Sequence, residues 1–393
     1  MLDVVWWALT GTWAGAPAWP QRGNGNTSIS WTSKGAPQKT RQKTAGLDST
    51  YQAGVWNWDG PVERELTLYA RSDNSFSVWD VARSNPRGPT NLVAPLPDLA
   101  SAAFHLTPDD LWNGLEAGGK VRCKGLISDW LTWQYMPQHA PVPQSPFALL
   151  TQVLKQLSPH PGETIEPGQP MRVSIEDVRD IPTIDLPYGN IPIIYASAGM
   201  KRIIGFAYLL VWAWYEHQQA SFLRGEPPTD HLILLIDEVE AHLHPRWQRS
   251  ILPALLDVAT ALNPQMHTQI ITTTHSPLVL ASVEPFFDVE HDKLFLFDLH
   301  EQTHVNLQEI PWAKQGDTVN WLVSAVFGLK QARSWEAEQA IEAAEALMRG
   351  EQMDGYPEHL RSTEHIHAEL LRLLPGHDPF WPRWIITTQR AGA

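Results

Sequence analysis

The sequence has a single cysteine, Cys123, among its 393 residues. A lone thiol can form neither an intramolecular disulfide nor a zinc site made of several cysteines, so both are excluded. The lack of a disulfide framework is typical of proteins in a reducing, cytoplasmic compartment, and we expect that location.

Basic residues are also few. The 29 Lys and Arg are outnumbered by 43 Asp and Glu, which leaves a formal net charge of −14. This balance excludes a chain coated in phosphate-binding surface, although it is compatible with a local basic patch that contacts DNA.

Long hydrophobic runs are absent. The longest one, residues 203–214, is interrupted only by small residues and predicts a buried helix. It is shorter than the roughly 20 residues that a membrane-spanning helix needs. The first residues lack the basic start and long apolar stretch of a signal peptide, so we expect no membrane partner. The 43% of hydrophobic residues is enough to form a core, which excludes wholesale disorder.

The first part of the chain, residues 1–82, begins with a helix-like segment, 2–10, and ends with alternating segments that predict a hairpin around Asp73 and Asn74. Between them lies a stretch rich in Gly, Pro, Ser and Thr. Five basic residues in it have no acidic neighbour: Arg22, Lys34, Lys39, Arg41 and Lys43. This pattern predicts a solvated loop or a loop that faces nucleic acid.

Residues 83–190 form a helical and proline-rich insertion. Helical patterns cover residues 108–133 and 146–157, and the proline-rich stretches 83–99 and 137–192 predict connections.

The character of the chain changes at residue 191. Two short apolar runs, 231–236 and 269–273, predict buried strands of a parallel sheet. The segments around them complete a β-α-β-β rhythm that is typical of an α/β sheet: a helix over 196–219, a helix over 245–262, a third strand over 293–299 and its partner over 304–310. Residues 311–393 predict a helical region, with helices over 318–327, 334–349 and 358–374.

Two acids, Asp237 and Glu238, directly follow the first of these strands. The carboxyl end of a strand faces the ligand crevice in an open α/β sheet. There Asp237 would hold Mg²⁺, which prefers carboxylate and water oxygens, and Glu238 would orient an attacking water. A buried strand that ends in a helix-capping acid is the alternative.

Two further signals flank the acids. His275 follows the second strand, and parallel pairing would bring it to the same sheet edge as Asp237, where it could donate to a γ-phosphate oxygen or to the water. Ser197 opens the long helix as its N-cap, with Ala198 and Gly199 leaving room for an anion and Lys201 and Arg202 adding positive charge. Taken alone, His275 also fits an ordinary surface or core histidine, and the Ser197 segment also fits an ordinary capped helix.

Together these segments resemble the ABC-type ATPases in their AAA-like branch. That branch includes the overcoming-lysogenization-defect ATPases, relatives of the chromosome-maintenance and recombination-repair ATPases, and many anti-phage defence ATPases. Residues 197–202 (SAGMKR) look like a degenerate signature motif, 232–238 (LILLIDE) like Walker B, 240–248 (EAHLHPRWQ) like the D-loop region, and 274–277 (THSP) like the switch-histidine segment. Residues 316–336 resemble the C-terminal helical part of the defence-type members.

The resemblance implies an ABC-ATPase-like α/β fold, with a mostly parallel sheet and flanking helices. It implies a head-to-tail homodimer that sandwiches ATP and Mg²⁺. Ser197, Ala198, Gly199 and Lys201 would face the γ-phosphate bound by the other subunit, Asp237 would support Mg²⁺, and Glu238 and His275 would act in catalysis. It also implies a DNA-related or anti-phage process and a nuclease or other effector protein as a partner. A Q-loop glutamine is expected as well, and Gln134 is the candidate.

The family's phosphate-binding loop, G-x-x-x-x-G-K-[ST], has no convincing counterpart. Residues 114–121 (GLEAGGKV) match its spacing but end in Val121, and no apolar strand precedes them, so we interpret the match as chance. Residues 2–11 resemble the helix that follows the loop in this family, so we expect that the sequence begins just after it. Without the loop, we expect weak or no ATP turnover.

Three rival interpretations remain. Glu240, His242 and His244 could bind zinc in a metal hydrolase, and residues 364–369 form a similar cluster on a polar helix. Residues 288–292 (DVEHD) are a thin basis for a nuclease site. The third rival is a scaffold that keeps half an ATPase without hydrolysing ATP.

Overall fold

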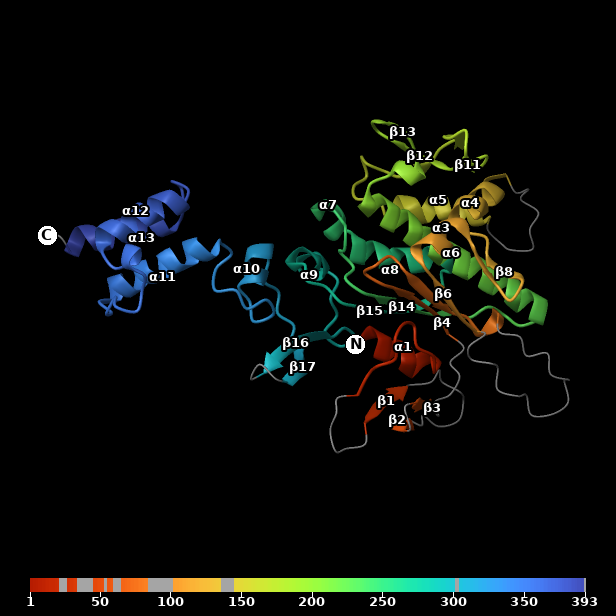
Figure 1. The fold of residues 1–393 in the computed structure, drawn as a ribbon, viewed down its shortest axis with the longest axis horizontal. Coiled ribbons are helices and arrows are strands. Elements are labelled where there is room, and N and C mark those ends of the chain that lie inside the picture. The colour runs from red at the N-terminus through yellow and green to blue at the C-terminus, as the bar shows by residue number, and fades with distance from the viewer. Residues whose placement is uncertain are drawn as a thin grey trace. The chain divides into compact units, whose positions relative to one another are not determined.

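The computed structural model describes residues 1–20, 27–33, 45–52, 55–58, 65–83, 102–135, 145–300 and 304–391. The chain has two compact units, Met1–Phe286 and Phe287–Ala393 (Figure 1). The five basic residues from Arg22 to Lys43 and most of the proline-rich stretch 83–99 lie outside the described residues. None of the helices in the described part of the chain is both long and apolar enough to cross a membrane.

A five-stranded sheet forms the centre of the first unit, with the strand order β15-β14-β4-β5-β6. Its strands are β4 (Leu66–Ala70), β5 (Phe76–Trp79), β6 (Ala103–Leu106), β14 (His231–Ile236) and β15 (His267–Thr272). β14 pairs in parallel with both β15 and β4, whereas β4, β5 and β6 are antiparallel. The sheet is therefore partly parallel, and the hairpin predicted around Asp73 and Asn74 is confirmed as β4–β5.

The centre of the sheet is buried on both faces, which explains the continuous apolar run of β14. The strand predicted over 269–273 is present as β15, but its predicted burial is wrong, because β15 lies at the edge of the sheet and none of its residues is fully buried. On one face, the main core contains the side chains of Leu232, Leu234 and Ile236. The opposite face carries Ile233 and Leu235, which lie in a second cluster with Trp6 of α1 (Leu2–Thr10), a fully buried side chain. Figure 1 shows α1 and the long helix α6 (Ala198–Arg224) on opposite sides of the sheet.

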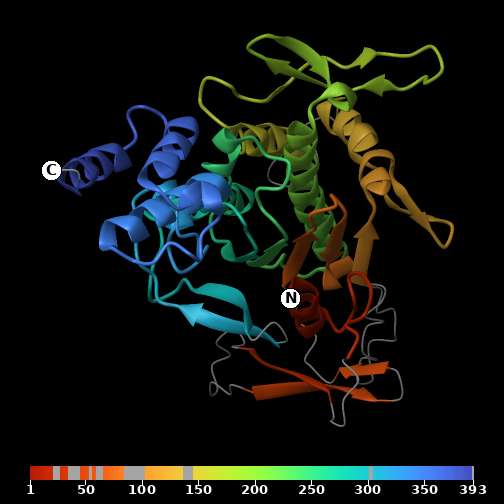
Figure 2. The same ribbon diagram turned by 60° about the vertical axis from the view of Figure 1, so that its left-hand side comes forward.

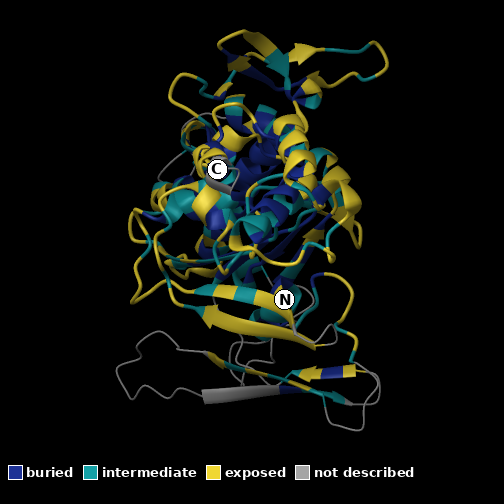
Figure 3. Ribbon diagram, turned by 90° about the vertical axis from the view of Figure 1, so that its left-hand side faces the viewer, coloured by how far each residue is buried: buried dark blue, intermediate teal, exposed yellow. Residues whose placement is uncertain are grey.

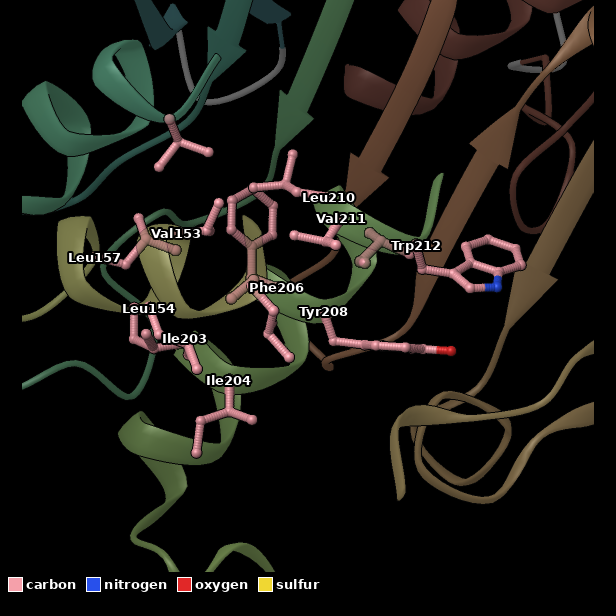
Figure 4. Packing of buried hydrophobic residues seen from close by; sticks show 14 of the residues in the cluster. Val153, Leu154, Leu157, Ile203, Ile204, Phe206, Tyr208, Leu210, Val211 and Trp212 are labelled. Carbon is pink, nitrogen blue, oxygen red and sulfur yellow. The ribbon is translucent and has the colours of Figure 1, made fainter. Parts of the chain in front are cut away.

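α6 fills the main core. Every residue from Ile203 to Trp214 is buried, which confirms the buried helix predicted there. The helix packs against α5 (Pro146–Gln156) and begins at the Ser197 cap. In the close view, Phe206 and Tyr208 extend from α6 among the surrounding apolar side chains (Figure 4). This packing fixes the position of the helix end that carries residues 197–202.

The helical prediction over 108–133 is confirmed only at the two ends of the segment. The segment instead forms a helix, a hairpin and a second helix: α3 (Pro108–Asn113), β7 (Leu115–Ala117), β8 (Lys120–Cys123) and α4 (Leu126–Tyr135). Gly114 and Gly125 break the helix at φ 108° and 85°, a region that favours glycine. A Cβ on Gly125 would lie 2.4 Å from the backbone nitrogen of Gly114, so the two strand ends cross too closely for a side chain.

The predicted helix over 245–262 is interrupted. α7 (Pro245–Gln248) ends after one turn, and α8 (Ile251–Leu262) begins three residues later. Pro253 explains the break, because its ring would clash with the carbonyl of Arg249 in a continuous helix.

Short strands, not plain connections, occupy part of the proline-rich stretch before residue 192. They are β9 (Glu166–Pro167), β10 (Met171–Arg172), β11 (Asp180–Ile181), β12 (Thr183–Leu186) and β13 (Gly189–Pro192), and they form two small sheets (Figure 2). Both residues of β10 and half of those of β13 are exposed, in contrast to the buried strands β4, β5 and β14 of the central sheet (Figure 3). The other small elements of this unit are β1 (Ser28–Ser33), β2 (Ala45–Gln52), β3 (Val55–Trp58), η1 (Val81–Arg83), η2 (Ile193–Tyr195) and α9 (Pro277–Val283).

In the second unit, β16 (Leu294–His300) pairs with β17 (His304–Ile310) in a two-stranded antiparallel sheet. The strand predicted over 293–299 and its partner over 304–310 are therefore confirmed, but they form a sheet of their own and do not extend the central sheet. Their short connection favours this pairing. The remaining elements are α10 (Thr318–Leu322), α11 (Trp335–Arg349), η3 (Glu358–Leu360), α12 (Thr363–Leu373) and α13 (Phe380–Ala391). α12 begins later than predicted because Ser362 caps it, α10 ends earlier than predicted, and α13 was not predicted.

Candidate functional site

The candidate site lies at the carboxyl ends of β14 and β15. Because these strands are parallel, the residues that follow them reach the same edge of the sheet. The Thr273 hydroxyl donates to Asp237 Oδ1 at 2.8 Å, and the Ser72 hydroxyl donates to Asp237 Oδ2 at 3.1 Å. Both carboxylate oxygens of Asp237 are thus oriented by neutral donors, one from the loop after β15 and one from the β4–β5 turn.

Glu238 has an unusual backbone conformation. Its φ is 47°, in the left-handed region that non-glycine residues seldom adopt. The Glu238 N–H donates to Thr273 Oγ1 at 2.8 Å, and the Glu238 carbonyl accepts a hydrogen bond from Arg202 at 3.1 Å. Such strain persists only where the surroundings hold it, and it is concentrated at functional sites.

Glu240 ties the loop after β14 to the loop after β15. Its Oε1 accepts the N–H of His275 at 2.6 Å, and its Oε2 accepts the hydroxyl of Thr274 at 2.7 Å. The His275 side chain itself is exposed at this edge. The structure therefore brings Asp237, Glu238 and the His275 loop together through direct hydrogen bonds.

The start of α6 lies against the same loop. Ser197 accepts the N–H of Met200 at 3.3 Å as the predicted N-cap, and Ser197 and Ala198 are exposed. Gly199 is buried, and a Cβ at this position would lie 2.7 Å from the carbonyl oxygen of His242. Lys201, one turn further, is half-buried.

We expected Arg202 to offer its positive charge to an anion bound at the start of α6. The structure instead engages the Arg202 guanidinium elsewhere. Arg202 is only 8% exposed, and its guanidinium donates to oxygens of the β4–β5 turn and to the carbonyls of Asp237 and Glu238. The sequence thus predicted a different task for Arg202, and it did not point to Ser72 and Thr273 as parts of the site. The Thr272–Thr274 run offered a signal for Thr273, but nothing local pointed to Ser72.

The donors around Asp237 fit magnesium. Mg²⁺ takes oxygen ligands and is usually held by one or two carboxylates together with water and phosphate oxygens. Asp237 supplies a partly exposed carboxylate, and Ser72 and Thr273 place hydroxyl oxygens beside it. The residues present therefore match a hard cation.

The zinc alternative does not match. Over the described ranges, no group of three or more His, Cys, Asp or Glu side chains is placed to hold a metal ion. Both oxygens of Glu240 are used by the His275 loop, and His244 Nδ1 accepts the Arg246 N–H at 3.3 Å. In the second proposed cluster, His367 Nδ1 accepts the indole N–H of Trp384 at 3.0 Å.

The remaining alternatives also find ordinary structural roles. Residues 114–121 lie in and just before the β7–β8 hairpin. A phosphate-binding loop would instead join a strand to a helix, so the spacing match of these residues to that motif agrees with chance. Gln134 donates to the Gly168 carbonyl at 3.2 Å. Asp288 accepts from the Glu290 N–H and from the His291 ring in an exposed turn, where its carboxylate stabilises the local backbone.

We expect a Gly199→Ala variant to lose about 1–3 kcal/mol of unfolding free energy, because the added methyl group would push the His242 carbonyl out of place. Urea unfolding measures this loss. Gly15→Ala is the matched control, since a Cβ there meets no atom within 4 Å. Equal stability of the two variants would contradict the close approach of α6 to the loop.

Comparison with known proteins agrees with this geometry. Residues 184–281, which include the α6 start, both strands and the His275 loop, match the family described as "AAA domain, putative AbiEii toxin, Type IV TA system". This part of the chain is therefore an AAA domain of the ABC-type ATPase kind. The resemblance seen in the sequence is confirmed over this range.

Three curated proteins show distant similarity. The Septu protein PtuA of Bacillus mycoides is 33% identical over 97 residues, which is 25% of this chain and 12% of that protein. The Septu protein PtuA of Bacillus thuringiensis is 30% identical over 105 residues, 26% of this chain and 24% of that protein. The Retron Vc95 probable ATPase of Vibrio cholerae is 44% identical over 57 residues, 14% of this chain and 10% of that protein. The similarity thus spans at most 24% of the length of these relatives.

Proposed function

We propose that this protein is an ABC/AAA-like ATPase that acts as a nucleotide-switched homodimer. The observation that carries the proposal is the convergence of Asp237, Glu238 and the His275 loop at one sheet edge, joined by the Thr273 and Glu240 hydrogen bonds. The match of residues 184–281 to an AAA domain supports it independently.

Each residue has a role in this proposal. Bound Mg²⁺ would neutralise charge on the ATP phosphates, and Asp237 would hold it through an oriented carboxylate. Glu238 would accept a proton from the attacking water, and His275 would donate to the terminal phosphate. Ser197, Ala198, Gly199 and Lys201 would present the start of α6 to the nucleotide on the other subunit, where helix N–H groups favour an anion.

The cellular process is proposed from the relatives. Two of them are named Septu proteins and a third is named a retron ATPase. Together with the sequence resemblance to anti-phage defence ATPases, these names lead us to propose a role in anti-phage defence or a related DNA process. The expected partner is a nuclease or other effector protein that responds to the nucleotide state of the dimer.

Nucleotide binding tests the proposal. Because the sequence has no G-x-x-x-x-G-K-[ST] loop, we expect calorimetry on the 393-residue chain to give a Kd for Mg-ATP weaker than about 1 mM, with turnover at background. A version that carries a phosphate-binding loop is expected to bind within the usual range of about 1 μM to 1 mM and to hydrolyse ATP. Tight Mg-ATP binding by the 393-residue chain would contradict the need for the loop. Absence of Mg-ATP binding by the version that carries the loop would contradict the proposed ATPase function.

The second candidate is a non-hydrolysing scaffold or partner subunit of a nuclease effector. The observation that favours it is that these 393 residues contain no G-x-x-x-x-G-K-[ST] sequence. It predicts nucleotide-independent association with the effector, whereas the ATPase predicts association that changes with bound ATP.

A further inference from the structure

We propose that Arg202 is the positioning residue that holds the Asp237–Glu238 segment in the geometry that binds a divalent cation. This inference rests on the proposed function, because it assigns a task to a residue that acts through the two acids. Arg202 touches neither carboxylate in a hydrogen bond that the structure records. Its contacts are with the backbone that carries them.

The Arg202 guanidinium joins three elements. From α6, Nη2 donates to the carbonyls of Asp237 and Glu238, each at 3.1 Å. Nη1 donates to the carbonyls of Arg71 at 3.1 Å and Ser72 at 3.3 Å, and to Asn74 Oδ1 at 3.1 Å. One side chain therefore fixes the end of β14 relative to the β4–β5 turn.

An arginine is needed for this set of contacts. The planar guanidinium offers five N–H donors in a rigid fork, whereas a lysine ammonium is a compact point charge with three donors. Arg202 is 8% exposed, and its burial lowers the pKa of the guanidinium, while the negative charges of Asp237, Glu238 and Glu240 act in the opposite direction. Without Arg202, the buried carbonyls that it serves would lose their donor.

These contacts act on both acids. Glu238 keeps its positive φ because Thr273 binds its N–H and Arg202 binds its carbonyl. Asp237 Oδ2 accepts the hydroxyl of Ser72, whose own carbonyl is bound by Arg202. Loss of the guanidinium would free the backbone of Glu238 and the residue that orients Asp237.

A purely electrostatic role predicts the opposite result for metal binding. The Arg202 charge interacts with four acids, Asp237, Glu238, Glu240 and Asp73, so its removal would strengthen the attraction of a cation by Coulomb's law. Loss of positioning instead weakens cation binding, because residues that orient metal ligands typically contribute about 10- to 100-fold in affinity. The direction of the change therefore separates the two roles.

The experiment uses the full chain with Mn²⁺ alone as the probe, titrated by electron paramagnetic resonance, together with hydrogen exchange over residues 237–243. In Arg202→Met we expect Mn²⁺ binding to weaken by about tenfold and the exchange of this segment to accelerate by at least about tenfold. Arg202→Lys should recover only part of both effects. The control is Arg224→Met, which removes an arginine that donates to the Val81 carbonyl at the other end of α6 and should leave both readouts unchanged.

Tighter or unchanged Mn²⁺ binding in Arg202→Met overturns the proposal, and so does unchanged exchange over 237–243. The Asp237→Asn variant tests whether the bound Mn²⁺ depends on Asp237. If this variant binds as much Mn²⁺ as the parent chain, or if the parent chain binds none, the proposed metal role of Asp237 fails. The hydrogen-exchange comparison alone then decides the role of Arg202. If Arg202→Met does not fold, Arg202→Lys gives the same two readouts with smaller expected changes.

Discussion

A Glu238→Gln variant is expected to hydrolyse ATP about 100- to 1,000-fold more slowly than its parent, measured in a version that carries a phosphate-binding loop. Glutamine has the size of glutamate but cannot accept a proton from the attacking water. Because the Glu238 backbone is held through its N–H and carbonyl, the substitution should leave the shape of the loop unchanged. Steady-state turnover and nucleotide affinity are the measurements.

The same variant should accumulate as an ATP-bound dimer, visible by size-exclusion chromatography with light scattering. Nucleotide affinity is expected to stay within about twofold, since the side chain acts on water and not on the bound nucleotide. Glu226→Gln, an exposed residue in the segment after α6, is the matched control. Hydrolysis by Glu238→Gln at the parental rate would dismiss Glu238 as the general base.

The largest expected effect on stability belongs to Asp129 in the main core. Asp129 is 5% exposed, and Tyr208 donates to its Oδ2 at 2.8 Å. Burial raises the pKa of the Asp129 carboxyl from 3.8 to about 6, and the Tyr208 hydrogen bond only partly opposes this. The native state therefore holds the Asp129 proton more tightly than the unfolded chain does.

The sign of the pH dependence follows from this difference. The stabilisation from Asp129 is fully present below pH 3.8 and is lost as the pH rises through about 6. The shift corresponds to about 3 kcal/mol between the two limits. Asparagine resembles the protonated acid and does not titrate, so Asp129→Asn should be more stable than the parent by about 3 kcal/mol at pH 8 and nearly equal to it at pH 4.

Urea unfolding from pH 4 to pH 8 measures the free energy of unfolding of Asp129→Asn and of the parent. Taking the difference between the two proteins at each pH cancels the contribution of the other titrating groups. Tyr208→Phe provides a second test. It removes the hydroxyl that favours the charged carboxylate, so it should move the loss of stability to higher pH. A constant difference between Asp129→Asn and the parent across the pH range would contradict the raised pKa.

The parts of the fold that the sequence predicts correctly have strong local patterns. The apolar run 203–214 forms the predicted buried helix. The apolar runs of β14 and β15 form the predicted strands, although only β14 is buried. Their parallel pairing follows from the α8 crossover. These elements are also the ones that bring Asp237 and the His275 loop to one edge.

The parts that could not be predicted depend on distant contacts or on backbone angles. Ser72 reaches Asp237 across 165 residues of sequence, and Arg202 reaches the Arg71 carbonyl across 131 residues. The break of the expected helix at Gly114 and Gly125 depends on their positive φ values, which a helix-like pattern of apolar residues does not reveal. The assigned roles of Ser197, Lys201 and the acids stay predictions until nucleotide is bound.

A crystal structure with Mg²⁺ and a non-hydrolysable ATP analogue would show whether Asp237, Glu238 and His275 surround one bound nucleotide. We expect Mg²⁺ beside Asp237, at about 2.0–2.1 Å from its carboxylate or through one bound water. We also expect the terminal phosphate within hydrogen-bonding distance of His275 and facing Ser197 of a second copy. A nucleotide bound elsewhere, or a terminal phosphate remote from Asp237, Glu238 and His275, would contradict this arrangement.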